Sequence, residues 1–114
     1  MISFTEKVKA EQVTADLVEV MKTWNAFLPN LKLLCFYNEK TEHIVVELIN
    51  IPISHRRQGI CGQILDELTV IARGYGVEIW LEPVDLFGIS KQVLSSMYMG
   101  YGFSWVNSTW MRKQ

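Results

Sequence analysis

One segment constrains the fold of this chain more than any other. The run Arg-Arg-Gln-Gly-Ile-Cys-Gly-Gln-Ile-Leu, at 56–65, directly follows an apolar, β-branched stretch. This order predicts a strand, a short turn rich in glycine and arginine, and an amphipathic helix. The first turn of a helix has backbone N–H groups without intrahelical partners, at the positive end of the helix dipole. The segment therefore predicts a site for a phosphate or pyrophosphate, with Arg56 and Arg57 contributing positive charge.

The remaining sequence predicts helices and strands in a mixed order. In chain order we expect a helix over 13–28, strands at 31–37 and 44–51, a helix at 60–72, a strand at 77–81, a helix at 91–99, and strands at 103–106 and 109–111. The first two strands flank a turn-prone stretch and should form an antiparallel hairpin. The unit at 44–81 should be a right-handed crossover with parallel strands. Its glycine turn then lies at the carboxyl end of the strands, where open α/β sheets bind ligands.

Length and composition narrow the functional classes. The chain has 114 residues, which predicts a single domain over 1–114, and 49% of them are hydrophobic, enough to form a core. A net charge of −1 argues against nucleic acid as a partner. Neither a stretch of transmembrane length nor a secretion signal is evident, so we expect no membrane partner and a cytoplasmic location. Cys35 and Cys61 should be reduced thiols, and no cysteine–histidine cluster has metal-ligand spacing, so no metal is expected.

Two motifs resemble those of the GNAT superfamily of N-acyltransferases. The acyl-CoA motif of that superfamily reads Arg or Gln, two residues, Gly, one residue, then Gly or Ala. Arg56 and Gly59 match its first two fixed positions, and Cys61 occupies the last. The segment Tyr-Met-Gly-Tyr-Gly-Phe at 98–103 resembles the late motif, in which a tyrosine precedes Gly-Phe and a final hairpin. The resemblance covers roughly 31–112 and implies an α/β fold. This fold would have a GNAT-like mixed central sheet, flanking helices and a shortened N-terminal part.

The resemblance also implies a binding mode for acetyl-CoA, the acyl donor. In the superfamily the strand before the motif and the strand after its helix separate, and pantetheine pairs with the first of them. In this sequence the backbone groups that would pair with pantetheine belong to Asn50, Ile51 and Ile53. The pyrophosphate would rest on backbone amides, with Arg56 and Arg57 adding charge. These amides are those of Arg57, Gln58, Gly59, Ile60, Cys61 and Gly62.

Two side chains are candidates for catalysis. Tyr98 matches the tyrosine that acts as general acid in the superfamily; the alternative is an aromatic residue that only packs against its neighbours. Glu47 is the one carboxylate within the apolar run at 44–51, where partial burial would make it a stronger base, so it is the first candidate for the general base. The alternative is a solvent-facing residue of an alternating strand. Glu82, Asp85 and water are further options for the base.

Other notable residues have ordinary structural explanations. His55 is interpreted as a solvated turn residue, with ligand contact as the alternative. Cys61 could be a reactive thiolate beside a helix N-terminus, but no acid or histidine is placed to make it a nucleophile. The aromatic residues should lie mostly in the core, with an acceptor cleft or a dimer contact as alternatives. They are Trp24, Phe27, Phe36, Tyr37, Trp80, Trp105 and Trp110.

The expected function is N-acetyl transfer from acetyl-CoA to a primary amine by direct attack. The acceptor is a small molecule or a peptide, which the sequence does not distinguish. The alternative is a catalytically silent GNAT-fold module that binds acyl-CoA and regulates a protein partner. A homodimer is one option for the assembly.

Overall fold

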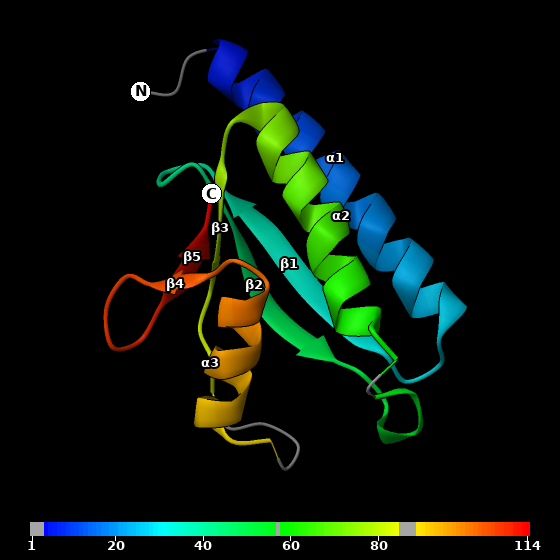
Figure 1. Ribbon diagram of the computed structural model, residues 1–114. Helices are drawn as coiled ribbons and strands as arrows, with labels where there is room; N and C mark the ends of the chain where they lie inside the picture. Colours follow the sequence, from blue (N-terminus) through cyan, green and yellow to red (C-terminus); the bar gives the residue numbers. More distant parts are fainter. Residues whose placement is uncertain (1–3, 57, 85–88) are drawn as a thin grey trace.

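The computed structural model describes residues 4–56, 58–84 and 89–114, which form helices and strands in the order that Figure 1 shows. In chain order the elements are α1 (Phe4–Phe27), β1 (Lys32–Asn38), β2 (His43–Asn50), the 3-10 helix η1 (Ile53–His55), α2 (Ile60–Tyr75), β3 (Glu78–Leu81), α3 (Lys91–Gly100), β4 (Ser104–Trp105) and β5 (Met111–Lys113).

The five strands form one mixed sheet in the order β1-β2-β3-β5-β4. β1 pairs antiparallel with β2, as the hairpin prediction requires. β2 and β3 pair in parallel on either side of the connection through α2, which confirms the crossover unit. β5 pairs antiparallel with both β3 and β4. The mixed α/β fold expected from the sequence is therefore present.

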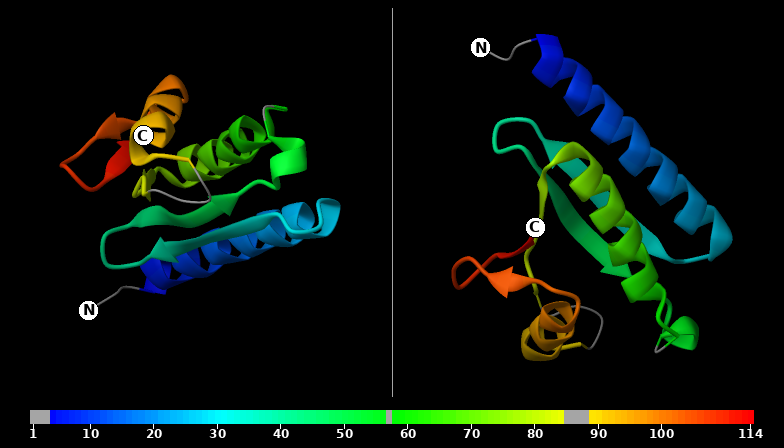
Figure 2. Two further views of the ribbon diagram at one scale, coloured as in Figure 1. Left: turned by 90° about the horizontal axis from the view of Figure 1, so that it is seen from below. Right: turned by 45° about the horizontal axis from the view of Figure 1, so that its top comes forward.

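Helices α1 and α2 cover one face of the sheet. Alternate residues of β1 are buried and exposed, and the buried ones identify the face under the helices. In β1, Leu33 and Cys35 are buried against the helices, whereas Leu34 and Phe36 are 49% and 41% exposed. We call the face that carries Leu33 and Cys35 the covered face, and the face that carries Leu34 and Phe36 the open face. α1 and α2 lie side by side, with α2 over the middle of the sheet (Figure 1, Figure 2). The Asp16 carboxylate accepts a hydrogen bond of 2.7 Å from the Tyr75 hydroxyl, which links the two helices.

α1 is longer than its apolar pattern predicts. It begins at Phe4, whereas the pattern starts at Val13. Apart from Ala10, which is buried, the intervening residues are exposed or half-buried, and most of the charged ones are Glu and Lys, which favour helix without needing an apolar face. Among the described residues, α1 is the one helix that precedes β1.

The final hairpin is displaced from its predicted position. β5 begins at Met111, not at Thr109. The Asn107 side-chain oxygen accepts hydrogen bonds of 2.8 Å from the backbone N–H groups of both Thr109 and Trp110. These two residues therefore belong to the turn, because an asparagine side chain that binds nearby N–H groups stabilises a turn instead of a strand.

Candidate active site

The candidate site is a pocket of about 430 Å³ at the point where β2 and β3 separate. The parallel pairing of these strands ends with Val46 and Leu81, and β2 then continues to Asn50 with β1 as its strand partner. The polar residues of the lining come from β2, from the turn and the start of α2, and from the segments that follow β3 and include α3. They are Glu47, Asn50, His55, Arg56, Cys61, Glu82, Tyr98 and Tyr101.

Glu47 lies at an irregularity in β2. In the antiparallel ladder Leu34 pairs with Leu48 and Cys35 pairs with Val46, so Glu47 is an extra residue without a partner on β1. Such a β-bulge redirects side chains and is frequent beside active sites. The Glu47 side chain lines the pocket but is exposed. Of the two alternatives for Glu47, the solvent-facing position is confirmed and partial burial is wrong, because the strand leaves its β3 neighbour at this residue.

The chain leaves β2 earlier than predicted. The strand ends at Asn50, and Ile53 begins the 3-10 helix η1 instead of continuing the strand. Ile53 is 78% exposed, and the pocket lining among the described residues does not include it. Ile51 does line the pocket, and its carbonyl accepts a hydrogen bond of 3.0 Å from Arg56 Nε. Pro52 has no N–H group to offer a sheet ladder, which explains why the strand stops here.

The start of α2 has the backbone conformation of an open anion site. Gly59 is the N-cap residue, with a left-handed φ of 77°, and no side chain caps the helix. A Cβ atom built on Gly59 would meet no atom within 4 Å. Gly59 and Ile60 both line the pocket, whereas Gln58 is exposed and outside its lining. Arg57 falls outside the described residues.

Gly62 has a structural reason to be glycine. A Cβ atom at this position would lie 2.9 Å from both Cε1 and Oη of Tyr101. The missing side chain lets the tyrosine ring pack against the first turn of α2. Tyr101 also lines the pocket, and the sequence reasoning did not select it. Its place between two glycines was the available signal.

Tyr98 packs in the core and also reaches the pocket. It is 8% exposed, and its ring lies 5.9 Å from that of Phe103, between centroids. Its hydroxyl has no hydrogen-bond partner among the described residues and is not sealed from solvent, so it faces the pocket space. Burial raises the pKa of this hydroxyl, and the nearby Cys61 thiol raises it further. The group therefore stays protonated at neutral pH.

Cys61 lines the pocket as a thiol. Burial raises its pKa to about 11, so the group is a protonated thiol at neutral pH. The alternative of a reactive thiolate is therefore wrong. Among the described residues, no group of three or more histidine, cysteine or acidic side chains is arranged to hold a metal ion.

The other acidic and basic candidates lie around the rim. Glu82 directly follows β3, is exposed and lines the pocket. Asp85 falls outside the described residues. His55 also lines the pocket, and its Nδ1 lies 2.9 Å from the Ser54 hydroxyl.

Most of the aromatic residues are not in the core. Trp24 is buried, whereas Phe27 and Trp105 are 68% and 40% exposed and Phe36 is also exposed. The half-buried aromatic residues are Tyr37, Trp80 and Trp110. The assignment of these side chains to the core is therefore largely wrong. Phe36 and Trp80 lie on the open face, which no described helix covers, whereas Tyr37 lies on the covered face and packs against the core. Within the described residues, no helix combines the length and apolarity needed to cross a bilayer.

Solved structures share this architecture, although the sequence matches neither a family model nor a curated protein. The anti-CRISPR protein AcrVA5 superposes with a TM-score of 0.63 at 23% identity, over 72% of this chain and 87% of that one. Nourseothricin acetyltransferase gives 0.56 at 20% identity, over 71% of this chain and 55% of its own. An Agrobacterium tumefaciens protein, named as a proposed acetyltransferase, superposes with a TM-score of 0.50 at 17% identity, over 99% of this chain and 94% of that one. With these neighbours, this sheet order and both motifs, the chain has the GNAT acyltransferase fold.

Proposed function

We propose that the protein transfers an acetyl group from acetyl-CoA to a primary amine. The observation that carries this proposal is the pocket itself, which joins the uncapped start of α2 to the hydroxyl of Tyr98 through the gap between β2 and β3. The names of two structural neighbours, one an acetyltransferase and the other a proposed acetyltransferase, support the same reaction.

The residues present fit a CoA thioester. Beyond Val46, β2 has backbone groups on the side of the gap for which β3 provides no ladder partner, so an extended pantetheine chain has a strand edge to join. The first amides of α2, at Ile60 and Cys61, lack a capping side chain and suit a diphosphate. The space beside the Gly59 Cα is empty, which lets the ligand approach the backbone. Arg56 holds the turn to the end of β2 through Ile51.

The chemistry needs one acid and one base. The amine nitrogen attacks the thioester carbonyl, the carbon–sulfur bond breaks, and CoA leaves as a thiolate that must gain a proton. Tyr98 supplies that proton, because its side chain lines the pocket and its hydroxyl is protonated at neutral pH. The amine loses a proton to Glu47, to Glu82 or to water, since both carboxylates line the pocket and are exposed.

Two measurements test the proposal. Calorimetric titration with CoA should show saturable binding, and acetyl-CoA with a panel of amines should release free thiol. Tyr98→Phe should lower kcat by about 100-fold or more, because general acids contribute at least this much, without changing the CoA dissociation constant. Tyr75→Phe is the matched control: the Tyr75 hydroxyl donates to Asp16 between the helices, Tyr75 is not part of the pocket lining, and kcat of this variant should equal that of the wild type.

The outcomes separate the two candidate functions. Absence of CoA binding would refute both. CoA binding without turnover on any amine would favour a silent acyl-CoA-binding module that regulates a protein partner. Equal kcat for Tyr98→Phe and the wild type would remove Tyr98 from the mechanism and leave the transfer reaction intact.

A further inference from the structure

The open face of the sheet carries an apolar and aromatic surface. Phe36, Val45 and Trp80 lie side by side across β1, β2 and β3; Phe36 is exposed, Trp80 is half-buried, and Val45 is buried between them. Trp80 stacks on His43, with 4.5 Å between ring centroids, and lies 6.3 Å from the ring of Trp110. Exposed contiguous apolar surface on a small protein commonly marks an interaction site.

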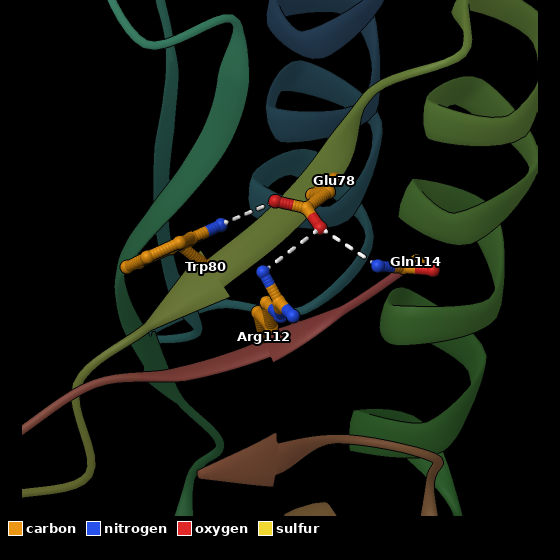
Figure 3. A network of polar contacts seen from close by, with 4 residues as sticks. All are labelled: Glu78, Trp80, Arg112 and Gln114. Carbon is orange, nitrogen blue, oxygen red and sulfur yellow. Dashed lines mark hydrogen bonds and ion pairs between the residues drawn. The ribbon is translucent and has the colours of Figure 1, made fainter. Parts of the chain in front are cut away.

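This surface is held rigidly. The Trp80 indole N–H donates a hydrogen bond of 3.0 Å to Glu78 Oε1. The other oxygen of the same carboxylate lies 3.1 Å from Gln114 Nε2 and 3.5 Å from Arg112 Nη1 (Figure 3). With both oxygens engaged, the carboxylate fixes the orientation of the indole. Rigid aromatic side chains lose little entropy on binding and are common anchors at protein interfaces.

The surface continues into the pocket. Leu34, on the open face, pairs with Leu48, and Leu48 lines the pocket. Val46, on the covered face, lines it as well, so the pocket extends through the gap between the strands. The exposed carboxylates of Glu47 and Glu82 follow the last strand pair at this gap. Their charge complements a positively charged amine.

The two ends of the pocket have different roles under the proposed function, on which this inference rests. The donor would occupy the side formed by the start of α2 and by α3, where Gly59, Cys61 and Tyr98 lie. The other end of the pocket, at Glu47 and Leu48 beside the open face, is then left for an acceptor. Small-molecule sites are concave and enclose most of their ligand. The open face has no helix over it among the described residues and offers a broad surface instead, which suits a polypeptide.

We propose that Leu34, Phe36 and Trp80 form a docking platform for a polypeptide acceptor, whose lysine side chain passes Glu47 and Glu82 to reach the thioester. The long, flexible stem of lysine suits this passage. The ε-nitrogen forms a bond to the acetyl carbon as the carbon–sulfur bond breaks. The nitrogen gives up one proton to a carboxylate or water, and the CoA thiolate gains one from Tyr98.

Competition between acceptors tests the platform. The probes are lysine-centred pentapeptides, acetylated at the N-terminus and amidated at the C-terminus, with two randomised residues on each side. The reference acceptor is Nα-acetyl-lysine methylamide. Peptides with apolar or aromatic flanking residues should have a kcat/KM at least tenfold above the reference. Phe36→Ser should reduce the ratio of kcat/KM for these peptides to kcat/KM for the reference at least tenfold. Its CoA dissociation constant should be unchanged, which shows that the donor site is folded. Val18→Ser, an equally exposed apolar residue on α1, should leave the ratio unchanged.

Each contrary result has a definite meaning. If the reference amine is acetylated as well as every peptide, or if Phe36→Ser and Val18→Ser behave alike, the platform is refuted and the proposed function stands. If Phe36→Ser dissociates a homodimer in sedimentation without changing the ratio, the face binds a second copy and the inference is also refuted. If CoA does not bind, or if neither class of acceptor is acetylated, the proposed function fails together with the inference.

Discussion

Replacing Gly59 with alanine should destabilise the protein and weaken CoA binding, whereas Gly76→Ala should only destabilise it. The two glycines flank α2 and have similar left-handed conformations, with φ of 77° and 67°. A Cβ atom at either position meets no atom within 4 Å, so neither substitution causes a clash. Only Gly59 lines the pocket. The pair therefore separates backbone strain, which both variants share, from loss of ligand space, which only one suffers.

The shared term follows from the backbone alone. A residue with a side chain in the left-handed region costs about 1–2 kcal/mol relative to glycine. For a domain of about 114 residues this corresponds to a decrease in Tm of about 4–8 °C. Gly59→Ala has an additional effect on ligand binding, because its methyl group lies where the diphosphate should approach the amides of α2. We expect it to raise the CoA dissociation constant at least tenfold, or about 1.4 kcal/mol.

Thermal unfolding with and without CoA measures both terms, and calorimetric titration gives the dissociation constants directly. Gly76→Ala should bind CoA like the wild type after its lower Tm is taken into account. The reasoning is wrong if the two variants bind CoA equally well, because the ligand then does not approach Gly59. It is also wrong if Gly76→Ala unfolds at the wild-type temperature.

Three further results are expected. Gly62→Ala should destabilise the protein, because the new methyl group contacts the ring of Tyr101. In a double-mutant cycle of urea unfolding, Tyr101→Ala should remove much of the destabilisation that Gly62→Ala causes; additive effects of the two substitutions would contradict the contact. Partial burial lowers the pKa of His43 below 6.5, so the free energy of unfolding should fall as the pH drops below 6.5. The hydrogen bond from the Trp80 indole lowers the pKa of Glu78 below 4.5, so the free energy of unfolding should fall again below pH 4.5. Glu78→Gln should reduce the second decrease, and identical acid limbs in urea titrations would refute the assignment. Cys61, with a pKa of about 11, should react slowly with iodoacetamide at pH 8, and more slowly with CoA bound; fast alkylation that CoA does not affect would show that the thiol lies outside the ligand space.

Local chemistry made much of the fold predictable. The helix that starts after Gly59 was expected because glycine and arginine punctuate the end of an apolar run, and α2 begins at the predicted residue, Ile60. The hairpin of β1 and β2 followed from two β-branched runs around a turn, and the short helix before the late glycines is also present. Each of these signals depends on residues within a few positions of one another.

Errors occurred where distant parts of the chain decide the outcome. The sequence left both partial burial and solvent exposure open for Glu47, and a bulge opposite β1 together with the end of β3 pairing leaves it exposed. The residue pattern of β2 does not reveal where its neighbour ends. Phe36 and Trp80 were assigned to the core because aromatic side chains usually lie there, yet no described helix covers their face of the sheet.

The sequence by itself determined the glycine turn before α2, since a left-handed glycine and free helix amides are properties of a few consecutive residues. Only the tertiary structure decided that β2 and β3 separate after four pairs and that Tyr98 faces the resulting gap. It also decided that an aromatic face adjoins that gap. Strand register and helix placement depend on packing between segments dozens of residues apart, for which the local pattern of side chains carries no signal.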